Sequence, residues 1–121
     1  MINIKALHEV VDKPYKYGEL DCLQLLKMVY GEELPTEYKG VSIENYTEVF
    51  DEPSKAGEFL LEAIQHYFSP VKYPKIGDVV VVNTTHIIGI YAGNNMMITA
   101  FIDNGIKTIP IVFPVTYWRL S

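Results

Sequence analysis

The stretch Pro14–Gly31, PYKYGELDCLQLLKMVYG, contains the single cysteine of the chain, and the rest of the sequence is best interpreted from it. Beginning at Cys22, its apolar residues recur at the i, i+3, i+4 and i+7 spacing of one helix face. Asp21 is a favoured N-cap residue, because its carboxylate can accept a free N–H of the first turn, and a glycine such as Gly31 is typical of a helix end. We therefore expect a helix that carries the thiol in its first turn.

The position of Cys22 supports two interpretations. Free N–H groups and the positive end of the helix dipole favour the thiolate, which is the nucleophilic form of cysteine. A cysteine on an apolar helix face is also an ordinary small core residue, and the spacing by itself favours this simpler interpretation. Other parts of the sequence have to decide between them.

Length and composition predict one globular domain over residues 1–121, since 49% of the residues are hydrophobic. A net charge of −5 argues against general nucleic-acid binding, which needs a basic surface. No apolar run is long enough to span a bilayer, and the start, MINIKALHEVVDK, is not a signal peptide. We expect synthesis and folding in the cytoplasm, with a virion tail or the cell wall reached by lysis or by an assembly that carries the protein.

Helical patterns precede strand patterns along the chain. Apolar spacing predicts helices over 4–11, 22–30 and 56–67, and residues 32–53 show no firm period and are expected to form an irregular connection. Strands are expected at 79–82, 86–91, 96–102, 106–112 and 117–120, with the Asn104-Gly105 pair in a hairpin turn. This order predicts an α+β fold in which N-terminal helices pack on an antiparallel meander.

Few residues can carry chemistry. The spacing of His8, His66, His86 and Cys22 matches no common metal site, and the glycines form no phosphate-binding loop, so no metal or cofactor is expected. A thiol with a later histidine remains, because Cys22 opens a helix and His86 opens a strand. A nucleophilic thiol needs such a base within hydrogen-bond reach, and a third group to orient the base.

A series of short motifs runs through the chain in a fixed order. They are PYKYG at 14–18, DC at 21–22, YG at 30–31, LP at 34–35, PKIGDVV at 74–80, HIIGIYAGN at 86–94, MITA at 97–100 and YWR at 117–119. With these motifs the chain resembles the NlpC-type cell-wall cysteine peptidases, papain-like hydrolases of bacteria and phages, and it is most similar to their phage tail-associated branch. The resemblance covers nearly the whole chain and implies a papain-like domain.

The resemblance also implies roles for individual residues. Cys22 would be the nucleophile and His86 the base, and Thr99 stands where the family usually has a histidine as the third catalytic residue. Tyr15 would lie near the thiol, with its hydroxyl helping to hold the substrate or the oxyanion. Asp21, next to the nucleophile, would likewise contribute to binding the substrate or the oxyanion. The implied substrates are the peptide stems of peptidoglycan.

The sequence departs from the family pattern in three places. Leu23 follows the nucleophile, where many members have a serine that helps to bind the free amine of the substrate. The Thr99 hydroxyl can accept an imidazole N–H but has no charge to stabilise imidazolium. Two residues, Ile87 and Ile88, separate His86 from the following glycine, where the family has one. Either a bulge absorbs the extra residue, or Ile87 takes the place of the base and none remains.

Two functions follow from these observations. One is a peptidoglycan-directed cysteine endopeptidase associated with a phage tail. The other is a catalytically degenerate domain that is retained as a tail-assembly or binding component. The expected partners are accordingly peptidoglycan peptides or phage tail proteins. An acyltransferase or amidase on the same scaffold is a third possibility, because a Cys–His pair transfers acyl groups to water and to amines alike.

Overall fold

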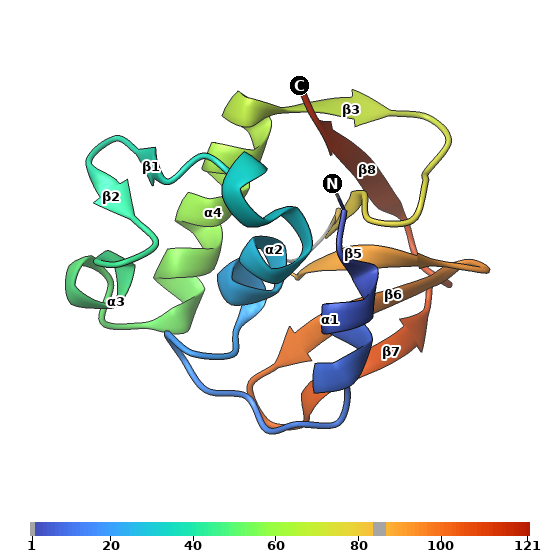
Figure 1. The fold of residues 1–121 in the computed structure, drawn as a ribbon, viewed down its shortest axis with the longest axis horizontal. Helices are drawn as coiled ribbons and strands as arrows, with labels where there is room; N and C mark the ends of the chain where they lie inside the picture. Colours follow the sequence, from blue (N-terminus) through green and yellow to red (C-terminus); the bar gives the residue numbers. More distant parts are fainter. Residues whose placement is uncertain (1, 84–86) are drawn as a thin grey trace.

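The computed structural model of the protein describes residues 2–83 and 87–121. Within these residues, helices lie against one face of a six-stranded antiparallel sheet with the strand order β3-β8-β4-β5-β6-β7 (Figure 1). The helices are α1 (Ile4–Val10), α2 (Cys22–Tyr30), α3 (Tyr46–Val49) and α4 (Pro53–Tyr67), and a 3-10 turn, η1 (Gly31–Glu33), follows α2. The expected α+β fold is confirmed.

The sheet contains β3 (Phe68–Val71), β4 (Val79–Val82), β5 (Ile88–Gly93), β6 (Met96–Phe101), β7 (Gly105–Pro110) and β8 (Val115–Leu120). A separate hairpin is formed by β1 (Glu37–Tyr38) and β2 (Val41–Ser42). Strands β4 to β7 form the expected meander, but β8 does not continue it. Instead β8 returns to the other side of β4 and pairs there with both β4 and β3.

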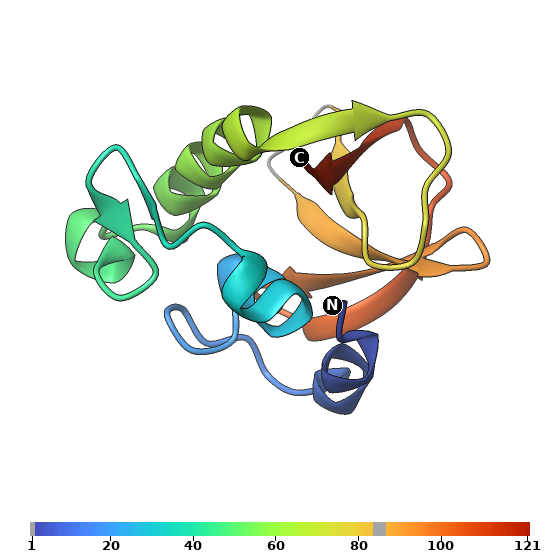
Figure 2. The same cartoon turned by 45° about the horizontal axis from the view of Figure 1, so that its top comes forward.

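The expectation of an irregular connection over 32–53 is wrong in part, because this segment contains the β1–β2 hairpin and α3. These elements are two and four residues long, too short to give a periodic pattern. The hairpin and α3 lie on one side of α2 and the sheet lies on the other (Figure 2). Strand β3 is likewise absent from the sequence prediction. Pro70 weakens the strand signal there, and it is tolerated because β3 is an edge strand.

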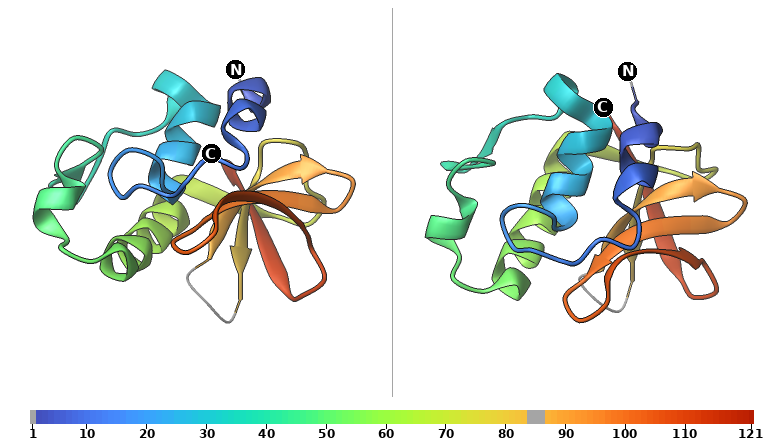
Figure 3. Two further views of the ribbon diagram at one scale, coloured as in Figure 1. Left: turned by 90° about the horizontal axis from the view of Figure 1, so that it is seen from below. Right: turned by 60° about the horizontal axis from the view of Figure 1, so that its bottom comes forward.

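The main core lies between the helices and one face of the sheet. Leu25, Leu26 and Val29 of α2 pack in one buried cluster with side chains of the sheet such as Ile90 and Ile98. Helices α1 and α2 lie side by side over this face (Figure 3). The opposite face has its own smaller cluster, which includes Val80, Val82, Met97 and Ile111. Because both faces are covered, all four residues of β4 are buried.

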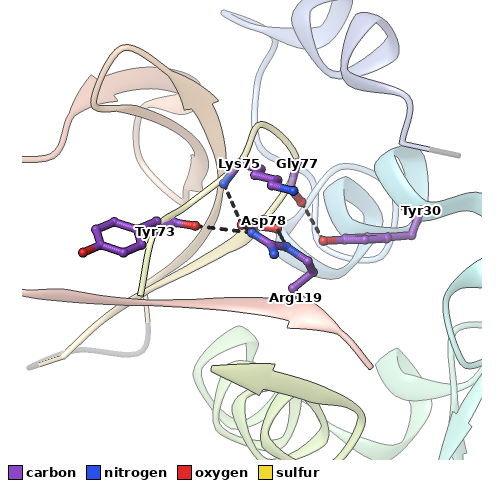
Figure 4. A network of polar contacts seen from close by, with 6 residues as sticks. All are labelled: Tyr30, Tyr73, Lys75, Gly77, Asp78 and Arg119. Atoms are coloured by element: carbon purple, nitrogen blue, oxygen red, sulfur yellow. Dashed lines mark hydrogen bonds and ion pairs between the residues drawn. The ribbon is translucent and has the colours of Figure 1, made fainter. Parts of the chain in front are cut away.

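A partly buried polar network joins α2 to the sheet (Figure 4). Arg119 of β8 donates from Nε to Asp78 Oδ1 at 2.9 Å and from Nη2 to Asp78 Oδ2 at 2.7 Å. The Lys75 backbone N–H donates to the same carboxylate at 2.7 Å, and the Tyr30 hydroxyl donates to the Gly77 carbonyl at 2.6 Å. Burial, reinforced by the Asp78 carboxylate, raises the pKa of Tyr30 and keeps its hydroxyl a donor. The network gives the YG, GD and YWR motifs a structural role.

Among the residues that the structure describes, none of the helices has the length and apolar character needed to cross a membrane.

Candidate active site

The start of α2 is fixed by Asp21, which caps the helix as expected. Its Oδ1 accepts the Gln24 backbone N–H at 3.0 Å, and its Oδ2 accepts the Gly18 N–H at 2.7 Å and the Tyr46 hydroxyl at 2.6 Å. The residue is only 4% exposed. With three donors on one buried carboxylate, Asp21 holds the approach loop, α2 and α3 together. Its expected contribution to substrate binding stays a prediction.

Cys22 is the first residue of α2, so the thiol lies at the N-terminal end of the central helix. Its Sγ donates to the Ile88 carbonyl oxygen at 3.3 Å. The Thr99 hydroxyl donates to that same oxygen at 2.9 Å. The backbone at the beginning of β5 therefore brings the expected nucleophile and the expected third catalytic residue to one atom.

Burial raises the pKa of the Cys22 thiol above its ordinary value. Hydrogen bonding to Ala100, Ile88 and Thr99 lowers it, and the Asp21 carboxylate raises it further. This direction is opposite to the one expected for a thiol at a helix start, because the loss of hydration outweighs the hydrogen bonds that favour the thiolate. In its described surroundings the thiol is held protonated, so nucleophilic attack needs a base.

His86, the expected base, lies outside the described residues, and its pairing with Cys22 stays a prediction. The neighbouring chain is described from Ile87 onward. The Val82 N–H donates to the Ile87 carbonyl at 3.0 Å, and Val81 pairs with Ile88 in the same register. The bulge expected at 87–88 is therefore wrong. The irregularity of β5 lies further along, between Tyr91 and Gly93, where its register with β6 shifts.

A regular ladder places Ile87 and Ile88 on opposite faces of the sheet. Ile88 belongs to the main core, whereas Ile87 packs against the cluster on the other face and also lines the cavity that reaches Cys22. Ile87 was expected to take the place of the base if no bulge formed. Its side chain packs on the face of the sheet away from the core that includes Cys22, so this replacement stays a prediction.

Thr99 is fully buried on β6, directly opposite Gly89 of β5. A Cβ on Gly89 would lie 2.7 Å from the Ile98 carbonyl oxygen, a backbone atom of the neighbouring strand, so only glycine fits there. Thr99 does not line the cavity, although its hydroxyl reaches the surroundings of the thiol through the Ile88 carbonyl. Its role in orienting a histidine stays a prediction.

We expect Thr99→Val to cost about 1 kcal/mol in the free energy of unfolding, because the shape is kept and one buried hydrogen bond is lost. The pKa of Cys22 should rise further, since the Thr99 hydroxyl lowers it. Urea unfolding and the pH dependence of thiol alkylation measure the two effects. Thr108→Val, on the exposed part of β7, is the matched control and should change neither. An unchanged Cys22 pKa in Thr99→Val would contradict the contact.

Tyr15 lies in the approach to α2 and lines the same cavity as Cys22. Burial, together with the nearby Asp21 and Cys22, raises the pKa of Tyr15, so its hydroxyl remains a donor. That hydroxyl makes no hydrogen bond to any residue in the described ranges. It is therefore free to act on a bound molecule, and its expected role toward the oxyanion stays a prediction.

The cavity beside Cys22 has a volume of about 330 Å³. It is bordered by α2, the β1–β2 hairpin, α3, α4 and the chain around 87–88 and 100–102. Leu23, the residue in place of the family serine, contributes to its wall. Sequence analysis also missed Tyr46, which is 3% exposed and connects α3 to Asp21. No local pattern could have indicated this contact, because 25 residues separate the two positions.

The remaining histidines of the described ranges lie elsewhere. His8 is in α1, and His66 in α4 packs against the rings of Tyr38 and Tyr67. Within residues 2–83 and 87–121, no three side chains of His, Cys, Asp or Glu form a group that could hold a metal ion.

Comparison with known proteins agrees with this geometry. The model of the NlpC/P60 family matches residues 12–118, a range that includes Cys22 and every motif quoted above except the last residue of YWR. No curated protein and no solved structure matches the chain. Because the family model matches most of its length, the chain belongs to the NlpC/P60 family.

Proposed function

We propose that the protein is a peptidoglycan endopeptidase of the Cys–His type, associated with a phage tail, with Cys22 as nucleophile and His86 as base. The NlpC/P60 family is in general one of cysteine peptidases that hydrolyse peptidoglycan. The observation that supports the proposal most is the position of the thiol. Cys22 begins α2 and lines the same cavity as Tyr15, whose hydroxyl has no hydrogen-bond partner within the described residues.

The proposed reaction follows from these groups. His86 takes the proton from Cys22, and the thiolate forms a C–S bond with the carbonyl carbon of a stem peptide. The Tyr15 hydroxyl and the N–H groups at the start of α2 stabilise the resulting oxyanion. The histidine then gives the proton to the leaving amine as the C–N bond breaks. Water hydrolyses the thioester, which releases the acid and restores the thiol.

A second candidate is a degenerate domain that binds within a phage tail without catalysis. One observation favours it. The ladder is regular at Ile87, so no bulge at 87–88 absorbs the extra residue between His86 and the following glycine.

The two candidates differ in the state of the thiol, which the rate of iodoacetamide alkylation against pH reveals. An enzyme should show its thiolate well below the ordinary pKa of about 8.5, because a histidine cation stabilises it, and His86→Ala should raise this pKa. His66→Ala removes an exposed histidine of α4 and is the matched control. A single titration at or above about 8.5 in wild type and His86→Ala alike would support the degenerate domain instead.

A further inference from the structure

The cavity beside Cys22 has a mostly apolar lining, which does not suit a charged peptide. Its walls are largely aliphatic and aromatic, and they include Leu23, Ile43, Phe50, Phe59 and Leu60. Its volume of about 330 Å³ lies at the lower end of the range for small-molecule pockets, ~300–1,000 Å³. The cavity therefore has the size and lining of a site for one small apolar group.

The charged residues of the cavity lining also favour an uncharged ligand. Within the described ranges, no lysine or arginine lines it, and its carboxylates are those of Asp21 and Glu37. The Asp21 carboxylate already accepts three hydrogen bonds, so it offers little to a ligand. An anionic group that entered would lose its hydration without gaining a cationic partner, which is costly. Glu37, the other carboxylate, is exposed and hydrated, so it compensates a buried ammonium group only weakly. An uncharged group is therefore strongly favoured.

The far wall consists of packed rings. Phe59 of α4 lies 5.4 Å from the ring of Tyr38 and 5.2 Å from that of Phe50, measured between ring centroids. Cys22 and Tyr15 also border the cavity. Within the described ranges the Tyr15 hydroxyl has no hydrogen-bond partner, and its raised pKa keeps it a donor for a carbonyl oxygen. An apolar chain attached to a carbonyl group fits a cavity that combines an apolar lining with a thiol and a hydroxyl donor.

We propose that the cavity binds an uncharged aliphatic or aromatic group on the acyl side of the bond that Cys22 attacks. The inference depends on the proposed function only in that Cys22 is the reacting thiol. The preference for an apolar group is a property of the cavity and is present without turnover.

The test uses N-alkyl iodoacetamides of increasing chain length, with alkylation of Cys22 measured relative to glutathione. Each added methylene should raise the relative rate about three- to fourfold until the cavity is full, since each buries apolar surface before the thiol reacts. Reagents of the same length that end in a carboxylate or an ammonium group should lose this gain. A relative rate that does not change with chain length in the wild-type protein would overturn the inference.

Two variants of α4 test whether the dependence on chain length arises in this cavity. Ala63→Trp places a large side chain in the α4 wall of the cavity and should abolish the dependence on chain length. Gln65→Trp, on the exposed side of the same helix, should keep it. Persistence of the dependence in folded Ala63→Trp would contradict this location, and Ala63→Leu replaces it if the tryptophan variant does not fold.

Hydrolysis is measured separately, so the two proposals can fail independently. Chain-length dependence without any hydrolysis would reject the endopeptidase and keep the binding site. Hydrolysis without chain-length dependence would reject only the apolar site.

Discussion

Replacing Cys22 with serine should reduce the release of soluble fragments from peptidoglycan roughly a thousandfold or more, to background. Serine keeps the approximate shape and a donor for the Ile88 carbonyl, which Cys22 Sγ contacts at 3.3 Å. It lacks the readily ionised thiol, and an alcohol is a weak nucleophile without a strong base. Mass spectrometry of the fragments measures activity, and urea unfolding should show that stability is nearly unchanged.

The choice of substrate decides whether a negative result counts. Leu23 stands where many family members bind a free amine with a serine, so the enzyme need not accept stems with a free N-terminus. Intact sacculi, crosslinked fragments and short stem peptides should therefore all be tried. Equal fragment release by wild type and Cys22→Ser would assign the hydrolysis to a contaminant or to another site. No release by either protein would favour the degenerate tail component.

The largest loss of stability is expected for Asp21→Ala. Losing the N-cap of α2 costs about 1 kcal/mol, and leaving the Tyr46 hydroxyl without its acceptor costs about 1–3 kcal/mol more. The sum, about 2–4 kcal/mol, is a large share of the stability of a small domain. Urea unfolding monitored by circular dichroism measures it, with Asp21→Asn as the conservative variant that retains an acceptor for the cap.

Tyr46→Phe separates the two contributions. It removes the 2.6 Å hydrogen bond to Asp21 without exposing the helix end. If Asp21 acts through both contacts, the double variant Asp21→Ala/Tyr46→Phe should be less destabilised than the sum of the single variants. Strict additivity would mean that Asp21 stabilises the protein through the cap alone, and a loss below about 0.5 kcal/mol in Asp21→Ala would contradict both roles.

Local signals were sufficient for α2. The cap at Asp21, the apolar spacing and Gly31 all act within a few residues of one another, so the sequence predicts both ends of the helix correctly. The β1–β2 hairpin depends on tertiary contacts instead. Tyr38 packs on Phe59, and the Tyr67 hydroxyl donates to the Glu37 carbonyl at 2.7 Å. No local pattern encodes these contacts, which explains why the segment looked irregular.

The candidate site likewise has features that adjacent residues predict and features that depend on tertiary contacts. The position of Cys22 at the helix start follows from adjacent residues, but the direction of its pKa shift does not. The helix end is a local property that favours thiolate, whereas the burial that raises the pKa depends on the packing of distant elements such as β5 and β6 around the thiol. The register at Ile87 also depends on β4, because pairing with Val82 fixes it, and a count of residues in one strand could not reveal this.

The network around Asp78 has a consequence for how the protein folds. Tyr30, at the end of α2, contacts Gly77, and the adjacent Asp78 is held by Arg119 of the last strand. These contacts join residues separated by 47 and 41 positions. Contacts so distant in sequence form slowly, because a long loop must close before they stabilise the chain. During synthesis, Arg119 can therefore hold Asp78, and with it the turn that Tyr30 contacts, only after β8 has left the ribosome.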